Sequence, residues 1–197
     1  MKIYPQIIAD SESGKGRIER AALFLFSEST IEGVSTKRIA EKADVSEGLL
    51  YRHFKSKEDL ARALMLTIHN RLTQLITDID NSDMSIAEKV RRLVIDYCHI
   101  ADGDWPLFKY HLLHLHRFSD LSESSEESPQ GAAASLLDKA MKRGDLPSEN
   151  ANLLAAMALG VVLQTAQTKI LGAIAGPLIP HAGRLTRGVL SVLGLED

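Results

Sequence analysis

Two short segments, each preceded by a serine, constrain the fold of this chain more than any other feature. Ser35 precedes a segment with helical spacing that ends at Ala43, and Ser46 precedes another that ends near Phe54. Because a serine side chain at such a position accepts a hydrogen bond from the first helical turn, both segments are predicted to be short helices. Asp44 lies in the turn between them, and aspartate tolerates the left-handed backbone that a tight turn requires. The pattern therefore predicts two short helices joined by a tight turn.

Further helices are expected on both sides of this pair. Ahead of it, apolar residues from Arg17 onward recur at helical spacing and stop before Gly33. After it, Ser56 and Asp59 match a capping box, and an apolar stripe continues to Ile79. The same spacing predicts helices over residues 86 to 103, 105 to 118, 130 to 143, 148 to 175 and 180 to 193. Since no stretch carries a strand signal, we expect an all-α fold with about nine helices.

Composition places the chain among folded cytoplasmic proteins and excludes a general affinity for nucleic acid. Apolar residues make up 45% and aromatic residues 5%, a mixture that favours helices over sheet. The net charge is −3, so any DNA-binding surface must be local. Cys98 is the single cysteine, which excludes an intramolecular disulfide and is typical of a reducing cytoplasm. Neither a secretory signal nor a long uninterrupted apolar run is present, so we expect no membrane partner.

The predicted pair of short helices carries a local excess of positive charge. Between Thr36 and Lys57 there are six basic and three acidic residues. Two helices joined by a tight turn are the arrangement in which one helix enters the major groove of DNA while the other braces on the backbone. Lys57 is informative because a cation in the first turn of a helix opposes the helix dipole. Its position indicates an anion at that place, such as a DNA phosphate.

The string GVSTKRIAEKADVSEGLLYRHFKSKEDL, residues 33 to 60, resembles the DNA-binding signature of the TetR (tetracycline-repressor-like) family almost position for position. The resemblance is strong over about residues 17 to 65 and architectural beyond them. It implies a transcriptional regulator, typically a repressor that a small-molecule ligand releases from its operator. Two positions depart from the family pattern: Leu49 stands where threonine is frequent, and Asp44 stands where glycine is common.

The resemblance also assigns DNA contacts. The family positions that contact phosphates, and so set register and affinity, match Thr36, Tyr51, His53 and Lys57. The positions that face base edges match Lys37, Glu47, Gly48, Leu49 and Arg52. Arg52 or Lys37 can bind guanine, and Leu49 can touch a thymine methyl group. Tyr51 and Phe54 have a structural alternative, as core residues of a helical bundle.

Three parts of the chain are expected: a flexible N-terminal arm at 1–14, a helix-turn-helix DNA-binding domain at 15–60, and a ligand-binding and dimerisation domain at 61–197. The acidic, serine-rich segment 119–131 is predicted to be a mobile loop.

A pocket with large apolar walls and few polar groups, suited to a small organic ligand, is expected between the middle helices. Its candidate residues are Tyr97, Trp105, Phe108, Tyr110, His111, His114, Phe118, Met141, Met157, Gln164 and Thr168.

The helix predicted over 148 to 175 is apolar around most of its circumference, more than one face of a domain covers. By resemblance, the last two helices pack against a second subunit, which predicts a homodimer on a palindromic double-stranded operator. The alternative is a central helix of a monomer.

Other functions find less support in the sequence. His111 and His114, with His99 or Cys98 nearby, suggest a metal sensor, but two histidines form half a site, and we expect neither a metal nor a cofactor. No catalytic motif of the serine-elbow, phosphate-loop or zinc-protease type is present, so we expect no enzyme and no catalytic residues. An enzyme and an all-helical interaction module remain alternatives, and neither explains the residues around Tyr51.

Overall fold

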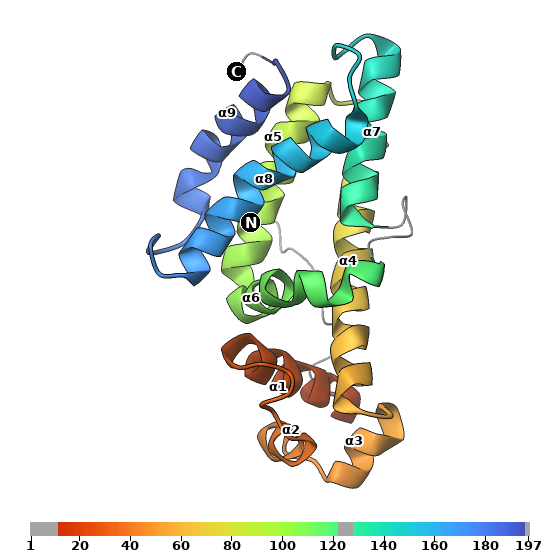
Figure 1. Cartoon of the computed structure of the whole chain (residues 1–197), viewed down its shortest axis with the longest axis vertical. Coiled ribbons are helices and arrows are strands. Elements are labelled where there is room, and N and C mark those ends of the chain that lie inside the picture. The colour runs from red at the N-terminus through yellow and green to blue at the C-terminus, as the bar shows by residue number, and fades with distance from the viewer. Residues whose placement is uncertain (1–11, 122–127, 196–197) are drawn as a thin grey trace. The chain divides into compact units, whose positions relative to one another are not determined.

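The computed structural model describes residues 12–121 and 128–195. These residues form nine α-helices and two 3-10 helices without a strand, which confirms the all-α prediction (Figure 1). The α-helices are α1 (Gly14–Glu28), α2 (Thr36–Ala43), α3 (Glu47–His53), α4 (Lys57–Asp80), α5 (Ile86–Gly103), α6 (Trp105–His114), α7 (Pro129–Arg143), α8 (Ala151–Ile170) and α9 (Ala182–Val192). The 3-10 helices are η1 (Leu115–Leu121) and η2 (Ile179–His181).

The predicted serine caps form around the two short helices. The side chains of Ser35, Ser46 and Ser56 each accept a hydrogen bond from the backbone N–H three residues later, at 3.2, 3.2 and 3.0 Å. Asp44 ends α2 with φ 52° and ψ 53°. It is the only non-glycine residue with positive φ in the described part of the chain. These local interactions produce the predicted helix-turn-helix.

Several predicted helix boundaries are wrong. α1 begins at Gly14 rather than Arg17, because the Ser13 side chain accepts a hydrogen bond from Gly16 N at 3.0 Å. The rest of the predicted arm, residues 1–11, lies outside the described residues. α8 begins after its cap Asn150 and ends where Gly172 turns the chain with φ 80°, so it is shorter than the predicted helix over 148 to 175. The predicted helix over 105 to 118 is α6 followed by η1.

The acidic segment 119–131 is a loop only in part of its predicted range. Residues 119–121 belong to η1, and residues 129–131 form the first turn of α7. Ser128 caps that turn by accepting a hydrogen bond from Gly131 N at 3.1 Å. The loop prediction is therefore wrong at both ends, and at the second end the reason is that a serine followed by a proline starts a helix. Residues 122–127 lie outside the described residues.

The chain divides into two compact units. Unit 1 contains α1 to α3, α4 up to Ile68, and residues 104–118 with α6. Unit 2 contains α4 from His69, α5, and the helices that follow residue 119. One helix, α4, therefore contributes residues to both units. The functional division into a DNA-binding and a ligand-binding domain stays a prediction.

In unit 1, α6 packs on α1 and is tied to it by polar contacts. The ammonium of Lys109 lies 2.9 Å from the carboxylate of Glu28, and two further ion pairs join Arg20 to Asp104 and Arg117 to Glu32. The buried Tyr110 hydroxyl donates to the backbone oxygen of Ala61 on α4 at 2.7 Å. α6, which the sequence suggested for the ligand-binding half, thus forms part of the same core as the short N-terminal helices.

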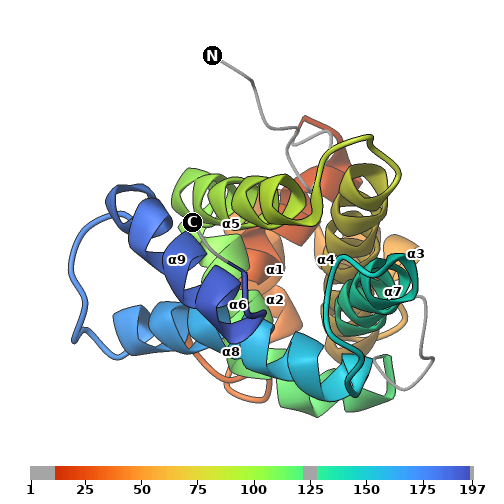
Figure 2. The ribbon, with the colours of Figure 1, turned by 90° about the horizontal axis from the view of Figure 1, so that it is seen from above.

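In unit 2, α7 packs on α8, and α9 packs on both α5 and α8 (Figure 2). α8 is the only helix in the described part of the chain that is long and apolar enough to cross a membrane, and 22% of its most apolar stretch is buried. One such helix is weak evidence of a membrane span. Leu153 and Met157, one turn apart on this helix, are 61% and 51% exposed.

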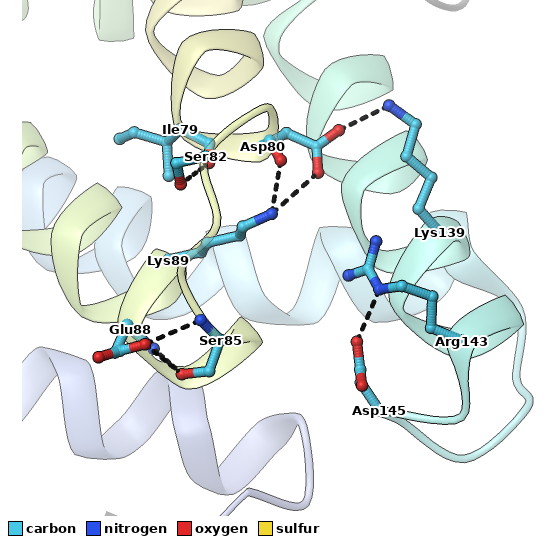
Figure 3. Close-up of polar contacts among 9 residues, drawn as sticks. All are labelled: Ile79, Asp80, Ser82, Ser85, Glu88, Lys89, Lys139, Arg143 and Asp145. Carbon is cyan, nitrogen blue, oxygen red and sulfur yellow. Dashed lines mark hydrogen bonds and ion pairs between the residues drawn. The ribbon is translucent and has the colours of Figure 1, made fainter.

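A buried ionic network fixes the end of α4 within unit 2 (Figure 3). The carboxylate of Asp80 lies 3.7 Å from the ammonium of Lys89 on α5 and 2.6 Å from that of Lys139 on α7. Lys89 also donates to the backbone oxygen of Asp80. The side chains of Asp80 and Lys89 are only 7% and 4% exposed. Since buried charges require partners, this network holds three helices at one point.

Removing the buried ammonium is expected to destabilise the protein. Lys89→Met keeps the apolar stem but leaves Asp80 with Lys139 alone, so the free energy of unfolding should fall by about 1–3 kcal/mol. Lys142→Met is the matched control, because its ammonium pairs with Asp138 on the surface, where such pairs contribute below about 0.5 kcal/mol. Urea denaturation followed by circular dichroism measures both. Equal losses in the two variants would contradict a structural role for the buried network.

Candidate nucleic-acid interface

The nine predicted DNA-contacting residues all lie in unit 1, on α2, α3 or the first turn of α4. Thr36, Leu49 and Lys57 are half-buried, and the other six are exposed. Tyr51 is 54% exposed, whereas Phe54, three residues later, is 4% exposed and belongs to the core. The structural alternative is therefore correct for Phe54 and wrong for Tyr51. A large aromatic ring exposed on a short polar helix is available for a partner.

Hydroxyl and carboxyl groups join α2 to α3 on this surface. The Thr36 hydroxyl donates to the Glu47 carboxylate, with 3.0 Å between Oγ1 and Oε1. The same Oγ1 lies 3.2 Å from the Tyr51 hydroxyl oxygen, within hydrogen-bond distance. Glu47, which is predicted to contact a base, is thus hydrogen-bonded to Thr36. Thr36 is in turn within hydrogen-bond distance of Tyr51, and both are predicted to contact phosphates. The sequence pattern gave no sign of this link between Glu47 and the two hydroxyls.

Lys57 is held by the protein itself. Its ammonium donates to the backbone oxygens of Glu32 and Val34, at 2.9 and 3.0 Å, in the segment between α1 and α2. Because these two carbonyls are internal acceptors for the ammonium, the position of Lys57 in the first turn does not by itself indicate an external anion. An ammonium has three donors, so one remains beyond these two bonds. A phosphate contact by Lys57 stays a prediction.

Leu49 lies against the start of α1. A Cβ added at Gly14 would stand 2.9 Å from a methyl carbon of Leu49, so the two helices meet closely here. The leucine side chain therefore helps to set the position of α3 in unit 1. Its contact with a thymine methyl group stays a prediction.

A groove of about 320 Å³ lies between α1, α2 and the start of α6 within unit 1. Its walls include Arg17, Arg20, Phe24 and Lys42. The Lys42 ammonium lies 4.0 Å from the centre of the Phe24 ring, and the Arg17 guanidinium lies 3.8 Å from the Asp44 carboxylate. None of the predicted pocket residues lines this groove. Since Arg17 and Arg20 form ion pairs with Asp44 and Asp104, the groove adds little net positive charge to this surface.

The predicted ligand-pocket residues fall in both units. Those in unit 1 are Trp105, Phe108, Tyr110, His111, His114 and Phe118, and those in unit 2 are Tyr97, Met141, Met157, Gln164 and Thr168. In unit 1, the ring centres of Tyr110 and His114 lie 5.0 Å apart, and His114 Nε2 lies 3.0 Å from the backbone oxygen of Phe26. Burial raises the pKa of the Tyr110 hydroxyl. These contacts give Tyr110 and His114 a packing role, and the pocket stays a prediction.

The described residues contain no cluster of three or more histidine, cysteine or acidic side chains suited to a metal ion. Cys98 is buried, and this burial raises the pKa of its thiol to about 11. Because the thiolate is the reactive form of cysteine, Cys98 is a poor nucleophile and a poor metal ligand at neutral pH.

Comparison with known proteins points to the same surface. A family profile described as bacterial regulatory proteins, tetR family, matches residues 18–64, which contain most of α1, all of α2 and α3, and the start of α4. HTH-type transcriptional regulators of Staphylococcus aureus strains USA300 and N315 are 45% identical to the chain over 51 residues. That stretch covers 26% of this chain and only 28% of each relative.

Solved structures resemble most of the chain in fold. The fatty acid degradation regulator FadR from Bacillus halodurans superposes with a TM-score of 0.78 at 20% identity, over 91% of this chain and 98% of the other. FadR from Bacillus subtilis, solved in complex with stearoyl-CoA, gives the same TM-score at 18% identity and the same coverage. A TetR-like regulator from Rhodococcus sp. RHA1 has a TM-score of 0.71 at 20% identity, covering 93% and 97%. At such identities the similarity is one of fold.

Proposed function

Because this chain belongs to the TetR family of bacterial transcriptional regulators, we propose that it is a cytoplasmic, sequence-specific DNA-binding repressor that a small-molecule ligand releases from its operator. The observation that supports this most is the exposed surface of α2 and α3, on which Tyr51 lies beside Thr36. More than half of the Tyr51 side chain is exposed, so this aromatic ring is available to a partner. Both the relatives and the fold are those of regulators rather than enzymes.

The proposed binding mode places α3 in the major groove. Its exposed side chains then face base edges, and Thr36, Tyr51, His53 and Lys57 face phosphates on either side. Arg52 is exposed on α3 and has the fork geometry that binds the O6 and N7 atoms of guanine. Phosphate contacts of this kind release counterions, so added salt should weaken binding steeply.

Substitutions on this surface should separate affinity from specificity. Tyr51→Ala is expected to weaken binding about 10-fold on every sequence, because it removes a phosphate contact. Arg52→Ala should cost about 1–3 kcal/mol on the operator and relax preference at particular bases. Gel shifts with DNA flanking the gene, against a scrambled duplex, measure both effects.

The matched control is Lys142→Ala, which removes an exposed cation from α7 in unit 2 and should leave binding unchanged. Lys57→Ala is a less clean test, because it also removes two internal hydrogen bonds. Unchanged affinity in Tyr51→Ala and Arg52→Ala alike would show that DNA binds elsewhere or not at all.

We propose further that the chain acts as a two-fold symmetric homodimer through α8 and α9. The support is the exposed apolar surface of α8, on which Leu153 and Met157 share one face. Such a surface costs free energy in water unless a partner covers it. A second copy of the same chain meets it with the same helices, as two-fold symmetry requires.

A charge on this face should split the dimer. Met157→Asp places a carboxylate where the second copy would bury an apolar side chain, so the protein is expected to become monomeric at micromolar concentration. Leu113→Asp is the control, since Leu113 is similarly exposed but lies on α6 in unit 1. Light scattering coupled to gel filtration should give twice the chain mass of 21.6 kDa for the wild type and for Leu113→Asp. A wild-type monomer would contradict the proposed assembly.

The proposed switch is a change in the tilt of α4. Its support is the continuity of this helix, whose residues up to Ile68 group with unit 1 and the rest with unit 2. A ligand that favours one tilt would change the separation of the two recognition helices, so ligand and DNA would oppose each other. The bound stearoyl-CoA of the Bacillus subtilis neighbour makes a long-chain acyl-CoA the first compound to test in a thermal-shift screen.

Calorimetric titration of the ligand with and without operator should show this opposition. Linkage requires that the ligand and DNA weaken each other by the same factor, typically about 1–3 kcal/mol. Leu72→Ala or Ile76→Ala, at buried positions of α4 in unit 2, should change this coupling more than it changes either affinity alone. Equal ligand affinities in the two titrations would exclude the switch.

A further inference from the structure

The hydroxyls of Thr36 and Tyr51 can each donate only one hydrogen bond. Each hydroxyl has one hydrogen to donate, whereas a carboxylate only accepts. The Thr36 hydroxyl donates its hydrogen to Glu47 Oε1 across 3.0 Å. It has none left for Tyr51, so across the 3.2 Å between the two hydroxyl oxygens Tyr51 is the donor. The three groups therefore form a directed chain from Tyr51 to Thr36 to Glu47.

These hydrogen bonds conflict with the phosphate contacts proposed for Thr36 and Tyr51. A phosphate oxygen of DNA accepts hydrogen bonds and donates none, so it binds a hydroxyl only through that hydroxyl's hydrogen. In the arrangement of the free protein both hydrogens are already used within the chain. Thr36 becomes a phosphate donor only when Glu47 releases it, whereas Tyr51 needs only to turn its hydrogen away from Thr36.

We propose that Glu47 is a specificity-determining residue that couples base recognition to phosphate binding. In the major groove, the N4 amino group of cytosine donates a hydrogen bond to the Glu47 carboxylate, and the carboxylate then releases the Thr36 hydroxyl. This role rests on the proposed DNA-binding function. Glu47 lies at the first position of α3 and is exposed, and both features suit a residue whose partner is a base edge.

The coupling makes one base pair control two contacts, that of Glu47 with the base and that of Thr36 with a phosphate. On DNA with the matching cytosine, the carboxylate gains a donor from the base, and the Thr36 hydroxyl becomes free to donate to a phosphate. On other DNA the carboxylate keeps the Thr36 hydroxyl occupied, and its uncompensated negative charge faces the phosphates. Discrimination therefore exceeds that of a single base contact.

The test compares an operator with a scrambled duplex of equal length and salt. Glu47→Ala should tighten binding to the scrambled duplex about 10-fold, because the Thr36 hydroxyl becomes a phosphate donor and a repelling charge is removed. Binding to the operator should stay equal or weaken, so the ratio of the two affinities falls about 10-fold or more. Changing the contacted cytosine to thymine should weaken the wild type and leave Glu47→Ala unaffected. Fluorescence anisotropy measures all of these affinities.

Two matched variants separate the coupling from simpler effects. Glu58→Ala removes an exposed carboxylate from the first turn of α4, outside the hydroxyl chain, so it should tighten binding to both duplexes equally. Thr36→Val keeps the shape of the side chain but breaks the hydroxyl chain, so Glu47→Ala should change the affinity ratio much less in this background. Circular dichroism checks that every variant stays folded.

Three outcomes overturn the role of Glu47. If Glu47→Ala weakens both duplexes equally, the carboxylate acts by supporting α3, whose first turn favours a negative charge. If it changes the ratio equally with Thr36 and with Thr36→Val, Glu47 reads its base independently of the hydroxyls. If the wild type does not distinguish the two duplexes, the proposed function fails, and the role of Glu47 fails with it.

Discussion

The left-handed backbone at Asp44 is the constraint on which the surface proposed to bind DNA depends. With φ 52°, Asp44 ends α2 and starts the turn into α3. Because this turn is short, the two helices share a core. The turn buries Leu50 and Phe54 and leaves Tyr51 exposed. It also brings Thr36 within hydrogen-bond distance of Glu47 and Tyr51. A residue unable to adopt this conformation would disturb both the core and the surface.

What the sequence predicted well rests on short-range physics. A serine cap, a left-handed aspartate and the spacing of apolar residues act over one or two helical turns, so α2, α3 and α4 were predicted with their caps. The misplaced helix ends at Ser13 and Ser128 follow from caps of the same local kind, whereas other misjudged features depend on contacts between distant residues. The acceptors for Lys57 are backbone oxygens 25 and 23 residues earlier, and no local pattern reveals them. Likewise α6 joins unit 1 through ion pairs between residues 81 to 85 positions apart.

The candidate pocket shows why ligand sites are harder to predict than helices. Tyr110 and His114 have the composition expected of a pocket wall, but a core uses the same side chains, and here both bond to backbone oxygens of unit 1. The sequence does reveal the continuity of α4, which is the property that the proposed switch needs. At its far end Asp80 joins α4 to α5 and α7 through two ammonium groups. A helix anchored in this way can transmit a change of tilt only together with its partners in unit 2.

The proposed function requires two copies of this chain to read DNA through α3. Selection of bound duplexes from a random pool, followed by sequencing, is the decisive measurement. We expect enrichment of two inverted half-sites whose centres lie about one helical turn, or a multiple of it, apart. Failure to enrich any sequence, or enrichment of sites without two-fold symmetry, would contradict it.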